Sequence, residues 1–113
     1  MSKKISRRSL LATSAAGATL AALPLAAQQS TLHKIDIKGF KFIPASLEVR
    51  PGDRIRWTNR DSAPHDATAD DRGWRTEVLR RGNSGEVTVT ADMDTNYFCS
   101  IHPNMRARLT IVS

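Results

Sequence analysis

Apolar and polar side chains alternate along several short segments of this 113-residue chain. The alternation is clearest in residues 54–59, where Ile55 and Trp57 share one face. A period of two is typical of a half-buried strand, so we expect Trp57 in the core. Further segments with strand character, several of them rich in β-branched residues, are 33–37, 46–50, 65–69, 75–79, 86–90, 96–99 and 107–112.

Turn signals separate these segments. Pro51-Gly52-Asp53 is a typical turn, because proline presets the first turn dihedral and glycine accepts the left-handed one. No segment after residue 27 shows a sustained helical period. Short strands with turns between them predict a single all-β domain, either a sandwich or a barrel.

The first 27 residues have the character of a targeting segment. A basic start containing Arg7-Arg8 precedes an uncharged, alanine-rich stretch that ends in Leu-Ala-Ala at residues 25–27. We interpret residues 1–27 as a bacterial export signal of the twin-arginine type, and residues 28–113 as the mature periplasmic domain. The alternative is an uncleaved membrane anchor, for which the apolar run is at the lower length limit.

The net charge of +6 overstates the basicity of the mature domain. Four of the 17 Lys and Arg residues lie in the leader, which leaves 13 basic against 11 acidic residues and a net charge of +2. The basic residues are scattered through strand-like segments, without a basic helix or a stacking-aromatic motif. This distribution does not indicate nucleic-acid binding.

The chemistry is concentrated in the spacing Cys99-x-x-His102-x-x-Met105. Cys99 is the only cysteine, which excludes an internal disulfide and a Cys-rich zinc or iron–sulfur site. A second histidine, His65, follows Pro64 near another predicted strand. Two imidazoles and a thiolate, with a distant axial thioether, make a blue-copper electron-transfer site. The sequence predicts one copper ion, cycling between Cu(I) and Cu(II), with His65, Cys99, His102 and Met105 as its ligands.

Other potential ligands fit less well. His33 lies early on a strand with no other ligand type nearby, so we interpret it as a surface or strand-edge histidine. Met93 sits in a charged turn and is a weaker axial candidate than the loop methionine. Asp70-Asp71, with Glu77 downstream, lacks the spacing of a calcium loop and indicates a solvated turn. Zinc can bind the same donors, but a thioether is a poor zinc ligand.

The pattern of these residues resembles the cupredoxin family of small blue copper proteins. Pro64-His65 followed by Cys99-x-x-His102-Pro103-x-Met105 is similar to the ligand pattern of the amicyanin group at all four ligand positions. The resemblance covers the mature chain and implies a Greek-key β-sandwich with a type 1 copper at one end. It also implies that the imidazole edge of His102 lies near the surface, inside an apolar docking patch formed here by Pro64, Ile101 and Pro103.

Two positions depart from the family pattern. Asp66 follows the first histidine where the family usually has asparagine. Its backbone N–H can still bond the sulfur of Cys99, while a carboxylate near a copper thiolate would stabilise Cu(II) and lower the potential. Asn104 stands where the amicyanin loop usually carries phenylalanine, which makes the docking patch more polar.

The resemblance implies a periplasmic carrier of single electrons that has no catalytic residues of its own. Its partners would be redox proteins, with an amine dehydrogenase and a c-type cytochrome as candidates. It would act as a monomer, without membrane insertion after processing. The alternative is a copper-binding module for copper delivery or resistance, which would share the ligand set. A copper enzyme would need an exchangeable coordination position, which a His₂CysMet set does not offer.

Overall fold

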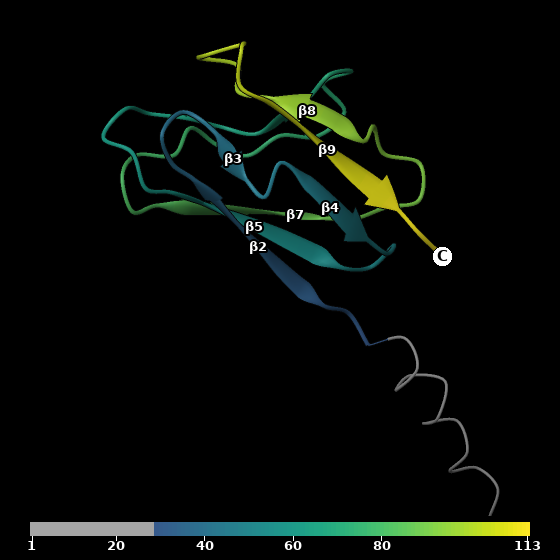
Figure 1. The fold of residues 1–113 in the computed structure, drawn as a ribbon. Coiled ribbons are helices and arrows are strands. Elements are labelled where there is room, and N and C mark those ends of the chain that lie inside the picture. Colours follow the sequence, from purple (N-terminus) through teal and green to yellow (C-terminus); the bar gives the residue numbers. More distant parts are fainter. Residues whose placement is uncertain (1–28) are drawn as a thin grey trace, which may run out of the picture.

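The computed structural model describes residues 29–113, and the predicted export signal lies outside the described residues. The described chain forms two four-stranded sheets, with strand orders β3-β2-β5-β7 and β4-β9-β8-β6. Figure 1 shows β2, β5 and β7 in one layer and β8 and β9 in the other. The strands are β2 (Leu32–Ile37), β3 (Phe42–Ile43), β4 (Ser46–Val49), β5 (Arg54–Asn59), β6 (Thr68–Ala69), β7 (Ser84–Thr88), β8 (Asn96–Phe98) and β9 (Arg106–Ile111).

Both sheets are mixed, because parallel neighbours are joined by crossovers between the layers. β2 pairs parallel with β5, and β4 pairs parallel with β9. The remaining pairs, such as β5 with β7 and β8 with β9, are antiparallel. This arrangement confirms the predicted all-β sandwich. Within residues 29–113, no helix has the length and apolar character needed to span a membrane.

The core lies between the two layers and contains the residues that the alternation selects. Ile55 and Trp57 of β5 are fully buried, as is Ile35 of β2. The Trp57 ring stacks on Trp74 and donates from Nε1 to the Tyr97 hydroxyl at 3.3 Å. Burial raises the pKa of Tyr97 to about 12. The expectation that Trp57 anchors the core is therefore confirmed.

Three expected strands differ from those in the structure. β7 begins at Ser84 and ends at Thr88, whereas the alternation predicted residues 86–90. The ladder ends before Val89 because the Asp53 amide donates to the Arg50 carbonyl within the turn before β5, and the Val89 carbonyl accepts from Gly52 instead. Residues 75–79 form only isolated bridges to the preceding segment, and of residues 65–69 only the last two form a strand. Pairings this short involve too few residues for an alternation of apolar and polar side chains to predict their bounds.

β5 has an aspartate near each end. Asp53 immediately precedes the strand, and Asp61 follows it by two residues. The six residues of β5 separate the two aspartates, so their carboxylates belong to opposite ends of the strand. Asp61 belongs to the end at which the chain turns towards His65.

Candidate metal centre

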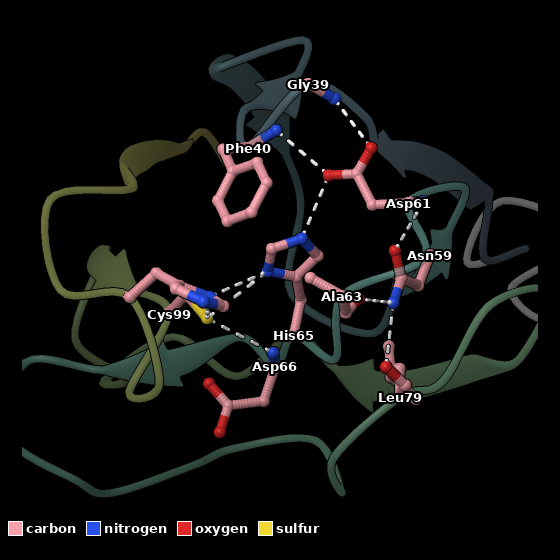
Figure 2. A network of polar contacts seen from close by, with 10 residues as sticks. Gly39, Phe40, Asn59, Asp61, Ala63, His65, Asp66, Leu79 and Cys99 are labelled. Carbon is pink, nitrogen blue, oxygen red and sulfur yellow. Dashed lines mark hydrogen bonds and ion pairs between the residues drawn. The ribbon is translucent and has the colours of Figure 1, made fainter.

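Three potential metal ligands, from segments far apart in the sequence, meet at one end of the sandwich. The Cys99 sulfur lies 3.8 Å from Nδ1 of His65 and 3.9 Å from Nδ1 of His102. The two Nδ1 atoms are 3.2 Å apart. In the part of the chain that the structure describes, this is the one group of at least three His, Cys, Asp or Glu side chains placed to hold a metal ion. Figure 2 shows His65 pointing towards Cys99.

His65 is fixed by pairing with a neighbouring segment and by complete burial. Its amide and carbonyl bond the carbonyl and amide of Leu79, at 3.1 and 2.7 Å. The side-chain amide of Asn59, at the end of β5, donates to the carbonyls of Ala63 and Leu79, while its oxygen accepts from the amide of Asp61. This buried asparagine therefore shapes the turn that brings His65 to the site. The alternation predicted Asn59 only as the last residue of a strand, which does not reveal this role.

Cys99 follows β8, and the other two residues of the motif lie in the loop that leads to β9. The loop is closed by its own backbone, because Met105 N–H donates to the His102 carbonyl at 2.9 Å. Cys99 N–H then donates to the Met105 carbonyl at 3.1 Å. Cys99 is fully buried and Met105 is 5% exposed, whereas His102 is half-buried. The three motif residues are thus held in one tight loop.

A carboxylate behind His65 determines which ring nitrogen faces the cluster. Asp61 lies 2.9 Å from Nε2 of His65, and Figure 2 shows this contact on the side of the ring away from Cys99. Burial would raise the pKa of Asp61, but the amides of Phe40 and Gly39, together with His65, lower it on balance. An ionised carboxylate only accepts hydrogen bonds, so Nε2 carries the proton and Nδ1 presents its lone pair to the cluster.

The expected hydrogen bond from Asp66 to the sulfur is present. Asp66 N–H donates to the Cys99 sulfur at 3.5 Å. The buried carboxylate accepts from the Ser100 amide at 2.7 Å, from the Ser100 hydroxyl, and from the Thr68 hydroxyl at 3.2 Å. Asp66 therefore ties the segment after His65 to the residue that follows Cys99.

The donor set fits copper. Two imidazole nitrogens that face each other across 3.2 Å, beside a buried sulfur, need a cation or a proton between them. Soft sulfur donors favour Cu(I) and imidazoles accept Cu(II), so this combination suits both oxidation states. Met105 would add a thioether donor from the same loop, and a thioether is a poor ligand for zinc.

The alternative donors lie elsewhere. His33 is hydrogen-bonded through Nε2 to Asp53 at 2.8 Å and is not part of the cluster, which agrees with its interpretation as a strand histidine. The Met93 sulfur accepts from the Thr90 amide at 3.2 Å. Asp70, which was expected in a solvated turn and not in a calcium loop, forms an exposed ion pair with Arg106 at 2.6 Å.

The surface beside His102 contains one residue that the sequence analysis did not select. A hollow next to the imidazole is lined by Phe40, Ile101, Pro103, Asn104 and Met105. Ile101 is 38% exposed and Phe40 is 48% exposed. Ile101 and Pro103 were expected in the docking patch and line this hollow, whereas Pro64, which was also expected there, is not among its lining residues. Phe40 had no place in the predicted patch. The glycine that precedes Phe40 marks a turn, which was the available signal.

Comparison with known proteins places this geometry in a family. The family model for the cupredoxin-like domain matches residues 10–111. Amicyanin from Paracoccus denitrificans is 24% identical over 82 residues, which are 68% of this chain and 63% of the amicyanin. The chain thus spans somewhat less than two thirds of that relative.

Solved structures share the fold. A Cu(I) form of an amicyanin mutant superposes with a TM-score of 0.65 at 24% identity, covering 72% of this chain and 82% of the amicyanin. A Cu-containing nitrite reductase from Thermus scotoductus SA-01 also has a TM-score of 0.65, at 26% identity, but is covered over only 22% of its length against 72% of this chain. With the family model spanning most of its length, the chain belongs to the cupredoxin-like domain family.

Proposed function

We propose that this protein is an exported carrier of single electrons whose copper ion is held by His65, Cys99, His102 and Met105. The observation that carries the proposal is the convergence of Nδ1 of His65, Nδ1 of His102 and the Cys99 sulfur, with separations of 3.2 to 3.9 Å. Copper would supply one-electron chemistry by changing between Cu(I) and Cu(II). Cu-bound amicyanins and a Cu-containing nitrite reductase among the structural neighbours support this choice of metal.

The arrangement of the protein groups favours electron transfer over catalysis. Three of the four proposed ligands are at most 5% exposed, and the fourth, His102, is half-buried. Four protein donors leave no obvious position for a substrate. The chain corresponds to a small part of the nitrite reductase, so that enzyme's activity is not transferred to it.

The ligand side chains are held by contacts that do not depend on a metal. Asp61 fixes His65, the Asp66 amide bonds the Cys99 sulfur, and backbone hydrogen bonds close the 99–105 loop. A pre-organised ligand set limits the rearrangement that accompanies a change of oxidation state. Such a set also suits retention of copper better than its release to a recipient protein.

His102 is the proposed exit and entry point for electrons. Its half-buried ring borders the hollow formed by Phe40, Ile101 and Pro103. A redox partner that docks on this apolar surface would lie close to a ligand of the metal. We propose that residues 1–27 direct export, that residues 28–113 form the mature domain in the periplasm, and that the partners are redox proteins such as an amine dehydrogenase and a c-type cytochrome.

The test is a visible spectrum of the purified mature protein with one equivalent of Cu(II), followed by reduction and reoxidation. We expect an intense blue thiolate-to-copper band that disappears on reduction and returns on reoxidation. A His33→Gln variant serves as a matched control, because it removes an imidazole that lies outside the cluster. A pale Cu(II) spectrum, or loss of copper on reduction, would contradict the proposal and favour a copper-delivery module.

A further inference from the structure

Phe40 lies in a backbone conformation that phenylalanine rarely adopts. It is the second central residue of the turn between β2 and β3, which is closed by reciprocal backbone hydrogen bonds between Lys38 and Lys41 at 3.0 and 3.2 Å. Gly39 has a φ of 62° and Phe40 a φ of 58°. Two-residue turns of this kind favour glycine or asparagine at both central positions. A bulky residue with a positive φ is a genuine outlier.

Burial of the phenyl ring does not explain this choice of residue. Phe40 is 48% exposed, so much of its apolar surface remains in contact with solvent. Glycine would adopt the same turn without a steric penalty. Strained residues of this kind cluster at functional sites, where the surrounding structure holds them in place. The contacts of the Phe40 ring therefore indicate its function.

The Phe40 ring packs edge-on against both proposed histidine ligands. Its centroid lies 4.9 Å from that of His65 at an interplanar angle of 87°, and 4.8 Å from that of His102 at 77°. The two imidazoles are themselves 4.9 Å apart at 63°. Edge-to-face contacts of this type are favourable and directional. One phenyl ring thus restrains both imidazoles.

The two histidines differ in how much they depend on that ring. His65 is fully buried and has its outer nitrogen on Asp61. The side-chain hydrogen-bond contacts found for His102 lie at Nδ1, on the inner side that faces Cys99 and His65. Within residues 29–113 we find no hydrogen-bond partner for Nε2 of His102. The Phe40 ring therefore restrains the imidazole of His102, as the Asp61 carboxylate restrains that of His65.

One carboxylate holds the strained turn and the buried histidine together. Asp61 accepts from the amides of Gly39 and Phe40 at 2.8 and 2.9 Å, and from Nε2 of His65 at 2.9 Å. Figure 2 shows the Phe40 ring extending from this turn towards the imidazole of His65. The position of the phenyl ring is consequently coupled to that of the cluster.

We propose that Phe40 is a positioning residue for His102, holding the imidazole so that Nδ1 stays directed at the metal position in the metal-free and the reduced protein. The inference rests on the proposed role of His65 and His102 as copper ligands. The unfavourable backbone conformation of Phe40 is retained because the turn places a ring where no hydrogen bond restrains His102.

Three variants separate this role from a general contribution to the fold. Phe40→Gly removes the ring and relieves the turn, and Phe40→Tyr keeps a ring. Ile43→Ala removes a similarly exposed apolar side chain, 51% exposed, from the neighbouring strand β3. The readouts are the imidazole ¹H–¹⁵N NMR signals of the metal-free protein, the thermal midpoint, and the rate at which a chelator removes Cu(I).

In the Phe40→Gly variant we expect His102 ring signals broadened or averaged by motion, while those of His33 stay unchanged. Its Cu(I) removal should be at least about tenfold faster, which is the scale of effects from groups that orient metal ligands. The thermal midpoint should not fall. Phe40→Tyr and Ile43→Ala should both stay close to the wild-type rate, because the first keeps a ring against His102 and the second leaves Phe40 in place.

The inference would be overturned if the Phe40→Gly variant had the same His102 ring signals and the same rate of Cu(I) removal as the wild type. It would also be overturned if Ile43→Ala accelerated Cu(I) removal as much as Phe40→Gly does. A fall in the midpoint matched by a proportional acceleration in every variant would show a merely structural role and overturn it as well. If wild-type protein fails to form the blue copper–thiolate band, the proposed function fails and the inference fails with it. A blue wild type with a silent Phe40→Gly variant rejects the inference alone.

Discussion

The two ends of β5 carry aspartate–histidine pairs with the same pattern of contacts. Asp53 lies 2.8 Å from Nε2 of His33, and Asp61 lies 2.9 Å from Nε2 of His65. Each carboxylate also accepts from two backbone amides, those of Thr31 and Arg50 at one end and those of Gly39 and Phe40 at the other. Both carboxylates thus connect a turn to a histidine from another segment of the chain, and in this respect the two pairs are equivalent.

They differ in what the second ring nitrogen meets. The His33 side chain is 20% exposed and stands outside the metal cluster. The His65 side chain is fully buried, and its Nδ1 faces the Cys99 sulfur and Nδ1 of His102. A carboxylate–histidine contact therefore joins two chain segments at one end of β5, and at the other end it also orients His65, which we propose to be a copper ligand. The distinction comes from convergence with other donors, which the contact alone does not reveal.

The largest expected effect comes from removing the sulfur that distinguishes the surroundings of His65 from those of His33. Cys99→Ser removes the sulfur towards which His65 points, so the blue absorption band should disappear completely in Cu(II)-loaded protein. Serine is close to cysteine in size, so the far-ultraviolet circular dichroism of the sandwich should be retained. A variant that remained blue would show that the ligand assignment is wrong.

A matched pair of carboxylate substitutions separates stability from metal binding. Asp53→Asn and Asp61→Asn each weaken three hydrogen bonds to a charged group, and each should lower the free energy of unfolding of the metal-free protein by about 1–3 kcal/mol. Only Asp61→Asn should also weaken copper binding, by about 10- to 100-fold, because it alone orients a proposed ligand. Competition with a chelator measures the affinities. Equal copper affinities in the two variants would contradict the comparison.

Acid should reduce the contribution that each aspartate, Asp53 and Asp61, makes to the free energy of unfolding. For Asp53, burial would raise the pKa, but His33 and the amides of Arg50 and Thr31 lower it on balance. The pKa of Asp61 is lowered in a similar way. A carboxyl whose pKa is lowered by folding stabilises the protein above its unfolded-state pKa of about 3.9, and that contribution is lost as the pH falls through the folded-state value. Unfolding of the metal-free protein should therefore become easier below about pH 4.

The Asp53→Asn variant tests the origin of that acid sensitivity. Chemical unfolding of wild type and variant, compared between about pH 6 and about pH 2, should give free energies that converge as the pH falls. A difference that stays constant over this range would show that the Asp53 charge does not contribute.

The smallest expected effect is that of His33→Gln. Loss of one partly exposed contact to Asp53 should reduce the free energy of unfolding by about 1 kcal/mol. The blue band and the copper affinity should remain unchanged, because this imidazole lies outside the cluster. A shifted visible spectrum would indicate that the two ends of β5 are coupled.

The sequence was sufficient to predict the fold class and the three residues, His65, Cys99 and His102, that meet in the metal cluster. Period-two alternation identifies β2, β5 and β9 because each has one face against the core. The proposed ligand motif can be recognised in the sequence because three of its four members lie within seven residues. The boundaries of β7 were not predictable, because the turn before β5 redirects the Asp53 amide to Arg50 and ends the ladder before Val89, despite the β-branched side chain of Val89.

The supporting groups around the site were largely invisible in the sequence. Asp61 and Phe40 act through a turn whose conformation depends on contacts made 21 and 22 residues along the chain. Nothing in the local pattern distinguishes Asp61 from Asp53. The Asp66 amide was predictable only because it follows His65 directly, and the partners of its carboxylate required the fold.

The most direct test of the ligand assignment is long-range ¹H–¹⁵N NMR of the histidine rings, with and without Cu(I), which is diamagnetic. We predict that the Nδ1 signals of His65 and His102 shift on Cu(I) binding, that Nε2 of His65 stays protonated on Asp61, and that both nitrogens of His33 are unaffected. A metal-dependent shift at His33, or at Nε2 in place of Nδ1 of His65, would contradict the account.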